Sequence, residues 1–344
     1  MAKIHFRIRS TPLDLELKRP FTISRGTRDS VRNLLIIVEA DGVTGIGEAA
    51  PNHRYNETRE SAEAFLAGFK SFTSEEPADT AALVTAMEQH GSGEYAAKAG
   101  LEMALYDWIG KKRSMPLYQL LGAPGPFGPR TTYTIGIDDT DTIREKVLEA
   151  DPYPLLKVKL GSPHDKEIIA VIRECTQKPI LVDANESWQT VDQALDMIRF
   201  LENKNVFIIE QPMPAGCMDG MKVLRDKSPI PLFADESVVR NESIPELAEG
   251  FHGINIKLMK TGAIRTSLTM LQNAHEAGLK VMVGCMLGSV IADSASALVA
   301  MWADYADIDG HLLIRNNPYR GVEVLPDGRL KLPETPGLGL ISDG

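Results

Sequence analysis

The chain has 344 residues, of which 43% are hydrophobic and 24% are charged, as is ordinary for a globular enzyme. Its formal net charge is −10 and it has no block of lysine or arginine, so we do not expect a nucleic-acid partner. No apolar stretch approaches the length of a membrane span, so we do not expect a membrane partner either. At this length we expect one large domain and a smaller one.

The start of the chain and its cysteines bear on the cellular compartment. The first residues, MAKIHFRIRS, carry charges and lack the apolar segment of a secretory signal. Cys175, Cys217 and Cys285 are odd in number and far apart, which predicts neither a disulfide framework nor a cysteine metal site. We therefore expect a cytoplasmic protein, and assembly into a homo-oligomer stays open.

Strand-like segments come first along the chain. Residues 3–17 alternate apolar and polar side chains in part. Residues 33–49 hold two β-rich runs separated by Asp41-Gly42, a pair typical of a tight hairpin turn. We expect an antiparallel arrangement in this part of the chain.

Helical segments follow the strands. Residues 57–71 and 79–122 are expected to be helical, and apolar residues recur at helical spacing around Leu101 and Trp108. Strands first and helices second predict an α+β domain over residues 1–125. The stretch GAPGPFGPR at 122–130 is rich in glycine and proline and marks its end.

Beyond this boundary, polar residues recur every 22 to 27 positions, each at or near the end of a short apolar run. One strand with one returning helix occupies about that length. Eight such units predict an α/β fold, a (β/α)7β TIM-like barrel over residues 126–314, with the catalytic groups at the C-terminal strand ends. The tail, 315–344, is expected to pack back onto the first domain. The recurring positions are Thr134, Lys159, Asp183, Glu210, Asp235, Lys257, the segment Gly284–Met286, and Asp307.

Three of these positions are carboxylates on neighbouring strands. Asp183, Glu210 and Asp235 would end the third, fourth and fifth strands, and adjacent strands lie about 4.8 Å apart. Such close negative charges are expected to raise one another's pKa values unless a cation relieves them. Oxygen ligands without His or Cys favour Mg²⁺. The nearby Asn185 and Glu236 could orient these ligands or the lysines.

Lysines flank the carboxylates. Lys157 and Lys159 are two apart in LLKVKL and share one face of a strand. The ammonium of Lys157 is expected to lower the pKa of Lys159 towards that of a base active near pH 7. Lys257, on the sixth strand, would lie across the barrel from the second strand. One lysine on each side of a metal-bound substrate can remove a proton from one face and return one to the other.

With these residues in place, the chain resembles the enolase superfamily and, within it, the muconate lactonizing enzyme subgroup. The motifs that carry the resemblance span nearly the whole chain: RPFTISRGTR, GIGEAAP, EMALYDW, KVK, DANESW, EQP, ADES and NIKLMKTG. The resemblance implies that Asp183, Glu210 and Asp235 bind Mg²⁺ and that Lys159 and Lys257 are the acid/base pair. Lys157 would be an auxiliary that also neutralises the substrate carboxylate.

The eighth strand indicates which class of substrate the site would bind. ADIDG places Asp307 and Asp309 on one face, and an acidic pair at the mouth suits a substrate ammonium group. The pattern resembles the dipeptide epimerases, in particular the L-Ala-D/L-Glu epimerases, in which such a pair binds the amino terminus of the dipeptide. This resemblance implies an isomerase of cell-wall peptide metabolism, with Thr134 among the groups that contact the substrate.

The implied reaction is a 1,1-proton transfer. The C-terminal carboxylate of the dipeptide would chelate Mg²⁺, one lysine would remove the α-proton, and the other would protonate the opposite face of the resulting enediolate. Arg25 and Arg54 lie in segments that resemble the two capping loops of the family. Either could pair with the side chain of a substrate glutamate.

Other functions stay open at this point. Within the same chemistry the alternatives are an o-succinylbenzoate synthase, an N-acylamino acid racemase or a muconate cycloisomerase, whose substrates lack a free ammonium group. A Schiff-base lyase would use one lysine and would not need three metal carboxylates. A non-catalytic binding protein on a decayed barrel would not need both lysines. The sequence does not tell which lysine serves which stereoisomer.

Overall fold

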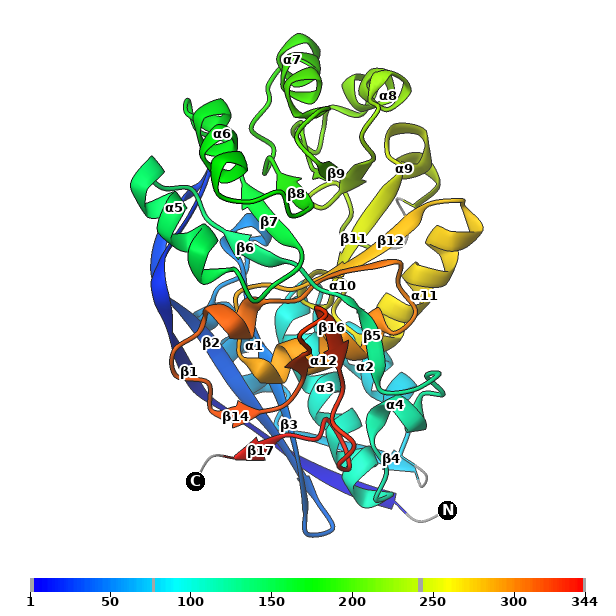
Figure 1. The fold of residues 1–344 in the computed structure, drawn as a ribbon. Coiled ribbons are helices and arrows are strands. Elements are labelled where there is room, and N and C mark those ends of the chain that lie inside the picture. The colour runs from blue at the N-terminus through cyan, green and yellow to red at the C-terminus, as the bar shows by residue number, and fades with distance from the viewer. Residues whose placement is uncertain (1–2, 76–77, 241–243, 343–344) are drawn as a thin grey trace.

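The computed structural model describes residues 3–75, 78–240 and 244–342. A long antiparallel sheet with helices forms the first part of the chain, and a barrel of parallel strands forms the second (Figure 1). We call the first part the cap. The ends of the expected cap and tail, residues 1–2 and 343–344, lie outside the described residues.

The cap sheet has four strands in the order β3-β2-β1-β4. Asp41 and Gly42 form the expected turn, with φ of 49° and 73°. The first two strands are longer than expected and form one hairpin that reaches the barrel. Residues 18–32 belong to this hairpin because its two strands pair with each other, although the sequence of this segment, with Pro20 and many charges, does not alternate. The strands are β1 (Lys3–Ile23), β2 (Gly26–Ala40), β3 (Val43–Ala49) and β4 (Ser71–Glu75).

The cap helices are shorter than expected, because Gly91 and Gly93 interrupt the long helical segment. The central helix, α3, is buried on all sides rather than along one stripe. It lies so close to β3 that a Cβ on Gly45 or Gly47 would be 2.0 Å from a backbone oxygen of α3. The helical segments are η1 (His53–Tyr55), α1 (Arg59–Gly68), α2 (Thr80–His90), α3 (Tyr95–Lys112) and α4 (Leu117–Leu120).

Eight parallel strands in sequential order, with helices between them, form the barrel, and the predicted α/β fold class is confirmed. The strands are β6 (Tyr133–Ile135), β7 (Leu156–Lys159), β8 (Ile180–Asp183), β9 (Val206–Glu210), β10 (Leu232–Ala234), β11 (Gly253–Lys257), β12 (Lys280–Gly284) and β13 (Tyr305–Asp307). The helices are α5 (Thr140–Glu149), α6 (Asp165–Cys175), α7 (Val191–Leu201), α8 (Met218–Lys227), α9 (Ile244–Gly250), α10 (Leu258–Thr261), α11 (Ile264–Glu276) and α12 (Val290–Ala300).

Hydrogen bonds between the first and last strands bring the two edges of the sheet together. Thr131 forms a parallel bridge with Ala306, and the Ile308 N–H donates to Thr131 Oγ1 at 2.7 Å. Three side chains that point into the barrel one layer below the mouth are apolar: Leu181, Ile208 and Phe233 each stand two residues before an expected metal ligand. The expected metal ligands therefore lie above an apolar floor, at the mouth.

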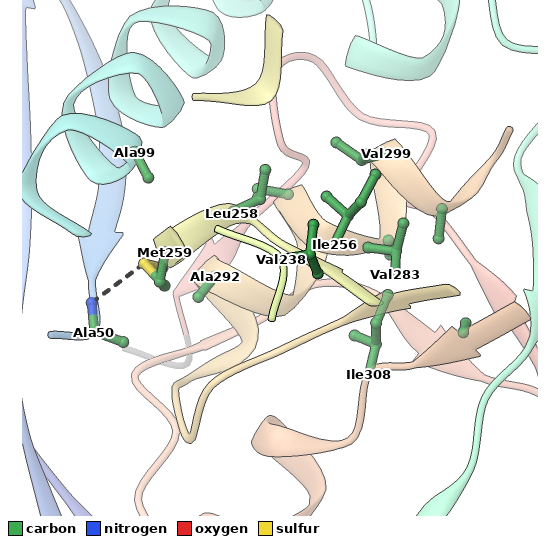
Figure 2. Close-up of a cluster of buried hydrophobic side chains, with 14 of the residues drawn as sticks. Ala50, Ala99, Val238, Ile256, Leu258, Met259, Val283, Ala292, Val299 and Ile308 are labelled. Atoms are coloured by element: carbon green, nitrogen blue, oxygen red, sulfur yellow. Dashed lines mark hydrogen bonds between the residues drawn. The ribbon is translucent and has the colours of Figure 1, made fainter. Parts of the chain in front are cut away.

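A second apolar region joins the barrel to the cap. Figure 2 shows Ile256 and Val283, from the outer face of the barrel strands, next to the buried side chains of the barrel helices. In the same view Met259 of α10 reaches Ala50, whose N–H donates to the Met259 sulfur at 3.4 Å. The cap and the barrel therefore share one continuous hydrophobic core.

The C-terminal tail crosses back over both parts. Its hairpin turns at Asp327-Gly328, and the Leu338 N–H donates to Asp107 of α3 at 2.8 Å. The domain limits at 125 and 314 stay a prediction. No helix among the described residues is both long and apolar enough to cross a membrane. The remaining elements are β5 (Phe127–Arg130), η3 (Gly310–Leu313), β14 (Tyr319–Arg320), β15 (Glu323–Val324), β16 (Arg329–Lys331) and β17 (Ile341–Ser342).

Candidate active site

Three buried carboxylates meet at the mouth of the barrel. Asp183 and Glu210 are the last residues of β8 and β9, and Asp235 directly follows β10. Asp183 is in register with both Lys159 and Glu210. Each carboxylate offers an oxygen, and these oxygens lie within 4.8 Å of one another. The arrangement follows from the strand spacing that the sequence predicts.

The three carboxylates do not share one electrostatic environment. Burial and the neighbouring Asp183 raise the pKa of Glu210 to about 7. Burial alone would raise the pKa of Asp183 and Asp235 as well, but adjacent lysines hold both pKa values below the ordinary range. The carboxylates raise one another's pKa values as expected, since Asp235 raises that of Asp183, but for the two aspartates the lysines beside them outweigh this effect.

Lys159 and Lys257 stand on opposite sides of the carboxylates. Lys159 Nζ lies 2.6 Å from Asp183 Oδ2, and Lys257 Nζ lies 2.8 Å from Asp235 Oδ2. In the ring of eight strands, β7 and β11 are separated by three strands in either direction. The two ammonium groups therefore project from opposite walls of the mouth, with the carboxylates on the strands between them.

Lys157 lies deeper in the barrel, among acids. Its Nζ is 2.6 Å from Asp307, 2.7 Å from Glu210 and 3.1 Å from Asp183 Oδ2, the oxygen that also contacts Lys159. Burial would lower the pKa of Lys157, but these carboxylates outweigh it and the pKa lies well above its ordinary value. The charge on Lys157 is thus held close to the place where Lys159 acts.

Sequence reasoning missed two buried groups that hold the carboxylates. Lys260 Nζ donates to Asp235 Oδ1 at 2.6 Å, and Asn255 Nδ2 donates to Glu210 Oε1 at 2.8 Å. Asn255 is two residues before Lys257 on β11, a spacing that could have identified it. A Cβ on Gly284 would come 2.6 Å from Asn255 and 3.0 Å from Lys257, so glycine at that position makes room for both.

The residues present fit a divalent metal ion. Six carboxylates and four lysines are buried here, an excess of negative charge that a divalent cation would offset. Three buried oxygens have no hydrogen-bond partner among the described residues: Asn185 Oδ1, Asn255 Oδ1 and Glu236 Oε2. An all-oxygen set of donors suits a hard ion such as Mg²⁺. The carboxylates are Asp183, Glu210, Asp235, Glu236, Asp307 and Asp309, and the lysines are Lys157, Lys159, Lys257 and Lys260.

The two residues expected to orient the ligands lie beside the carboxylates. The Asn185 N–H donates to Asp183 Oδ1 at 2.9 Å, and Asn185 Nδ2 donates to Glu236 Oε1 at 3.4 Å. The same Glu236 oxygen lies 2.9 Å from Arg25 Nη2. Asn185 thus contacts an expected ligand directly, whereas Glu236 connects this group to the cap.

Asp307 and Asp309 form the wall opposite the carboxylates. Asp307 forms an ion pair with Lys157 and also accepts a hydrogen bond from Thr132 Oγ1 at 2.6 Å. Asp309 Oδ2 accepts from the Thr134 N–H at 2.6 Å. Burial, together with the Asp307 carboxylate, raises the pKa of Asp309 to about 7. Asp309 is therefore the member of the pair that is open to a cationic ligand.

A cavity of about 690 Å³ lies between the barrel mouth and the cap. Its barrel side is lined by Lys157, Lys159, Lys257, Asp307, Asp309 and Thr134, and its cap side by Arg25 and Arg54. Both arginines are already paired with protein carboxylates: Arg54 Nε lies 2.9 Å from Glu186, and Arg25 contacts Glu186 and Glu236. The sequence did not point to Glu186 as their partner.

Comparisons with known proteins agree with this site. Residues 6–122 match the model described as "Mandelate racemase / muconate lactonizing enzyme, N-terminal domain", and residues 141–343 match "Enolase C-terminal domain-like". The chain is 40% identical over 331 residues to an L-Ala-D/L-Glu epimerase of Bacteroides thetaiotaomicron, covering 96% of this chain and 86% of that one. It is 41% identical over 328 residues to an L-Ala-D/L-amino acid epimerase of Pedosphaera parvula, covering 92% and 93%.

A solved structure is also similar to the chain. A dipeptide epimerase from Enterococcus faecalis, complexed with Mg and the dipeptide L-Leu-L-Tyr, superposes with a TM-score of 0.90 at 30% identity. The match covers 99% of this chain and 100% of that one. The likeness therefore includes both the cap and the barrel.

Proposed function

The chain belongs to the mandelate racemase/muconate lactonizing enzyme family of the enolase superfamily, and from this premise we propose that it is a Mg²⁺-dependent dipeptide epimerase. The reaction would invert the α-carbon of the C-terminal residue of a dipeptide such as L-Ala-D/L-Glu. The observation that carries the proposal is the placement of Lys159 and Lys257 on opposite walls, with three carboxylates between them.

Asp183, Glu210 and Asp235 would hold the metal ion. When bound, Mg²⁺ would supply a Lewis acid that draws negative charge from the carboxylate of the substrate. Asn185 and Asn255 keep two of these ligands in place through the hydrogen bonds described above. Asp235 lines the cavity, so a substrate carboxylate in the cavity could reach an ion that these residues hold.

Lys159 and Lys257 would exchange protons with the α-carbon. One lysine, as the neutral amine, removes the α-proton, and the other, as the ammonium, delivers a proton to the opposite face. Because the two lysines project from opposite walls, each stereoisomer presents its α-proton to one of them. Lys157, fixed by acids below the site, would stabilise the charge that develops on the substrate carboxylate.

Asp309 would hold the amino terminus of the dipeptide. It lies on the wall opposite the metal ligands, so a dipeptide whose carboxylate faces those ligands directs its ammonium group to Asp309. Thr134 supports Asp309 through its N–H. The substrates of o-succinylbenzoate synthases, N-acylamino acid racemases and muconate cycloisomerases have no ammonium group for this carboxylate, which favours the dipeptide reaction over them.

Arg25 and Arg54 are the candidates from the cap for contact with the substrate side chain. Arg25 is the better candidate, because it contacts Glu186 and Glu236 through one oxygen each, whereas Arg54 forms a bidentate pair with Glu186. The three free cysteines support placement in a reducing compartment such as the cytoplasm. A role in cell-wall peptide metabolism and a homo-oligomeric state stay predictions.

Deuterium uptake tests the function. In D₂O with Mg²⁺, a library of L,L-dipeptides should acquire one deuterium at the C-terminal α-carbon together with inversion, as read by mass spectrometry and chiral separation. Lys159→Ala should lower epimerisation by about 10³-fold. This variant should still exchange the α-proton for deuterium, without inversion, in the stereoisomer whose α-proton faces Lys257. Absence of exchange with the wild-type protein and every dipeptide would refute the proposal.

A further inference from the structure

The loop after β8 carries an acid, Glu186, whose side chain contacts the cap. Glu186 follows Asn185, and the two residues have φ of 65° and 43°. Two consecutive non-glycine residues in the left-handed region are strained and persist where other contacts hold them. This backbone turns the Glu186 side chain away from the expected metal ligand Asp183 and towards the cap.

The contacts of Glu186 connect three separate segments. Arg54 donates from Nε and Nη2 to the two Glu186 oxygens, each at 2.9 Å, in a bidentate pair. Arg25 Nη1 lies 3.4 Å from the same carboxylate, and the Ala215 N–H, in the loop after β9, donates to it at 3.0 Å. The Glu186 side chain is only 14% exposed. One carboxylate thus joins both capping segments to two barrel loops.

We infer that Glu186 is a positioning residue that fastens the capping segments over the barrel mouth, and that Arg54 is committed to this fastening rather than to the substrate side chain. A bidentate arginine–carboxylate pair uses the directional donors that recognition of a substrate carboxylate would require. Arg54 would have to leave Glu186 in order to bind an acidic substrate. The part of the inference that concerns substrates rests on the proposed function.

The fastening also bears on catalysis. Glu186 lies three residues after Asp183, so the contact that holds the cap is directly linked to the strand end that carries a metal ligand. Closing a site over its substrate excludes water and completes its geometry. Loss of the pair should therefore affect all dipeptides alike, whereas loss of a group that binds the side chain should affect acidic dipeptides most.

Kinetics with two dipeptides test the inference. Glu186→Gln keeps the size of the side chain and the acceptor for Ala215 but removes the charge. Glu186→Gln and Arg54→Ala should each lower kcat/KM by about tenfold, equally for L-Ala-L-Glu and L-Ala-L-Leu. The double variant should be no worse than either single variant, because both remove the same pair. Arg9→Ala is the matched control: Arg9 pairs with Glu39 at 2.9 Å inside the cap sheet, and kcat/KM should not change.

A second readout does not depend on the activity. Amide hydrogen exchange of residues 50–58, measured on the metal-loaded protein without substrate, should speed up in Glu186→Gln and Arg54→Ala and stay unchanged in Arg9→Ala. A fall in kcat/KM confined to L-Ala-L-Glu on Arg54→Ala, or unchanged exchange in both variants, would overturn the inference. A wild-type protein that epimerises no dipeptide would instead refute the proposed function, and the exchange result would still decide whether Glu186 fastens the cap.

Discussion

At the scale of single residues, the pKa of each carboxylate in the site depends on whether a lysine lies beside it. Asp307 and Asp309 are two apart on one face and look equivalent in the sequence. In the structure Lys157 forms an ion pair with Asp307. The pKa of Asp307 therefore lies below its ordinary value, although burial alone would raise it. No lysine or arginine among the described residues forms an ion pair with Asp309, and its pKa is raised to about 7. The two acids therefore have different electrostatic environments.

This difference predicts a pH dependence of substrate binding. Asp309 must be ionised to hold an ammonium group, so KM for L-Ala-L-Glu should rise as the pH falls through about 7. Asp309→Asn should raise KM by about tenfold or more at pH 8 and remove this pH dependence, because the carboxylate is gone. The measurement is KM between pH 6 and pH 8.5.

A substrate without an ammonium group provides the control. N-acetyl-L-Ala-L-Glu cannot use Asp309, so its binding should be weak in both proteins and should not respond to the substitution. Equal KM values for wild type and Asp309→Asn with the free dipeptide would show that Asp309 does not bind the amino terminus.

Residue identities at the mouth were largely predictable from the sequence. Strand periodicity placed Lys157 and Lys159 on one face, and strand spacing brought Asp183 and Glu210 together, because both are local properties of regular structure. Lys260 was not predicted. It lies within the short helix α10 that follows β11 rather than on the strand, so its approach to Asp235 depends on the path of α10.

At the scale of elements, acidic side chains of the cap accept hydrogen bonds from the first N–H groups of barrel helices. Glu48 of β3 is fully buried and accepts hydrogen bonds from the N–H groups of Ser289 and Ala292, at the start of α12. Glu102 of α3 accepts likewise from Ile264 at the start of α11, whose N-cap residue offers no side-chain hydrogen bond. The first N–H groups of a helix lack partners within it, so these acids satisfy donors that would otherwise be buried without one.

The Glu48 contact predicts a loss of stability on truncation. Glu48→Ala removes the acceptor from Ser289 and leaves buried donors without a partner, so the free energy of unfolding should fall by about 1–3 kcal/mol. Urea unfolding followed by circular dichroism measures this change.

An exposed acid of the same sheet is the matched control. Glu39 pairs with Arg9 at 2.9 Å, and both side chains are about a third or more exposed. Glu39→Ala should change the free energy of unfolding by less than about 1 kcal/mol. A Glu48→Ala protein as stable as Glu39→Ala would show that the helix start is satisfied in another way.

Element boundaries were the part of the fold least visible in the sequence. The barrel strands and the Asp41-Gly42 turn were predicted, because apolar runs and turn residues are local signals. The hairpin through residues 18–32 was missed because its pairing, and not its own sequence pattern, makes it a strand.

At the scale of the whole molecule, the cap and the barrel enclose one charged site inside one hydrophobic core. The buried acids outnumber the buried lysines at the mouth, so the folded chain without a cation contains unrelieved repulsion. A divalent ion that binds this site should therefore bind the folded chain and not the unfolded one.

Metal binding should consequently raise the thermal stability. Mg²⁺ at about 100 times its Kd should add about 2.7 kcal/mol to the free energy of unfolding and raise Tm by several degrees, as measured by calorimetry with and without EDTA. Glu210→Gln should lose most of this rise, because it removes one charged ligand and keeps the shape of the side chain. An equal rise in Glu210→Gln would place the stabilising ion elsewhere.

The sequence by itself determined the barrel, its strand ends and the groups that point into the mouth, because a strand alternates sides with a period of two and a βα unit has a nearly constant length. The pairings were decided only by the tertiary structure. Lys157 with Asp307, Arg54 with Glu186 and Glu48 with Ser289 join residues 150, 132 and 241 positions apart. Such contacts depend on how loops and domains come together, and the strength of an ion pair or hydrogen bond changes steeply over the last ångström of that approach.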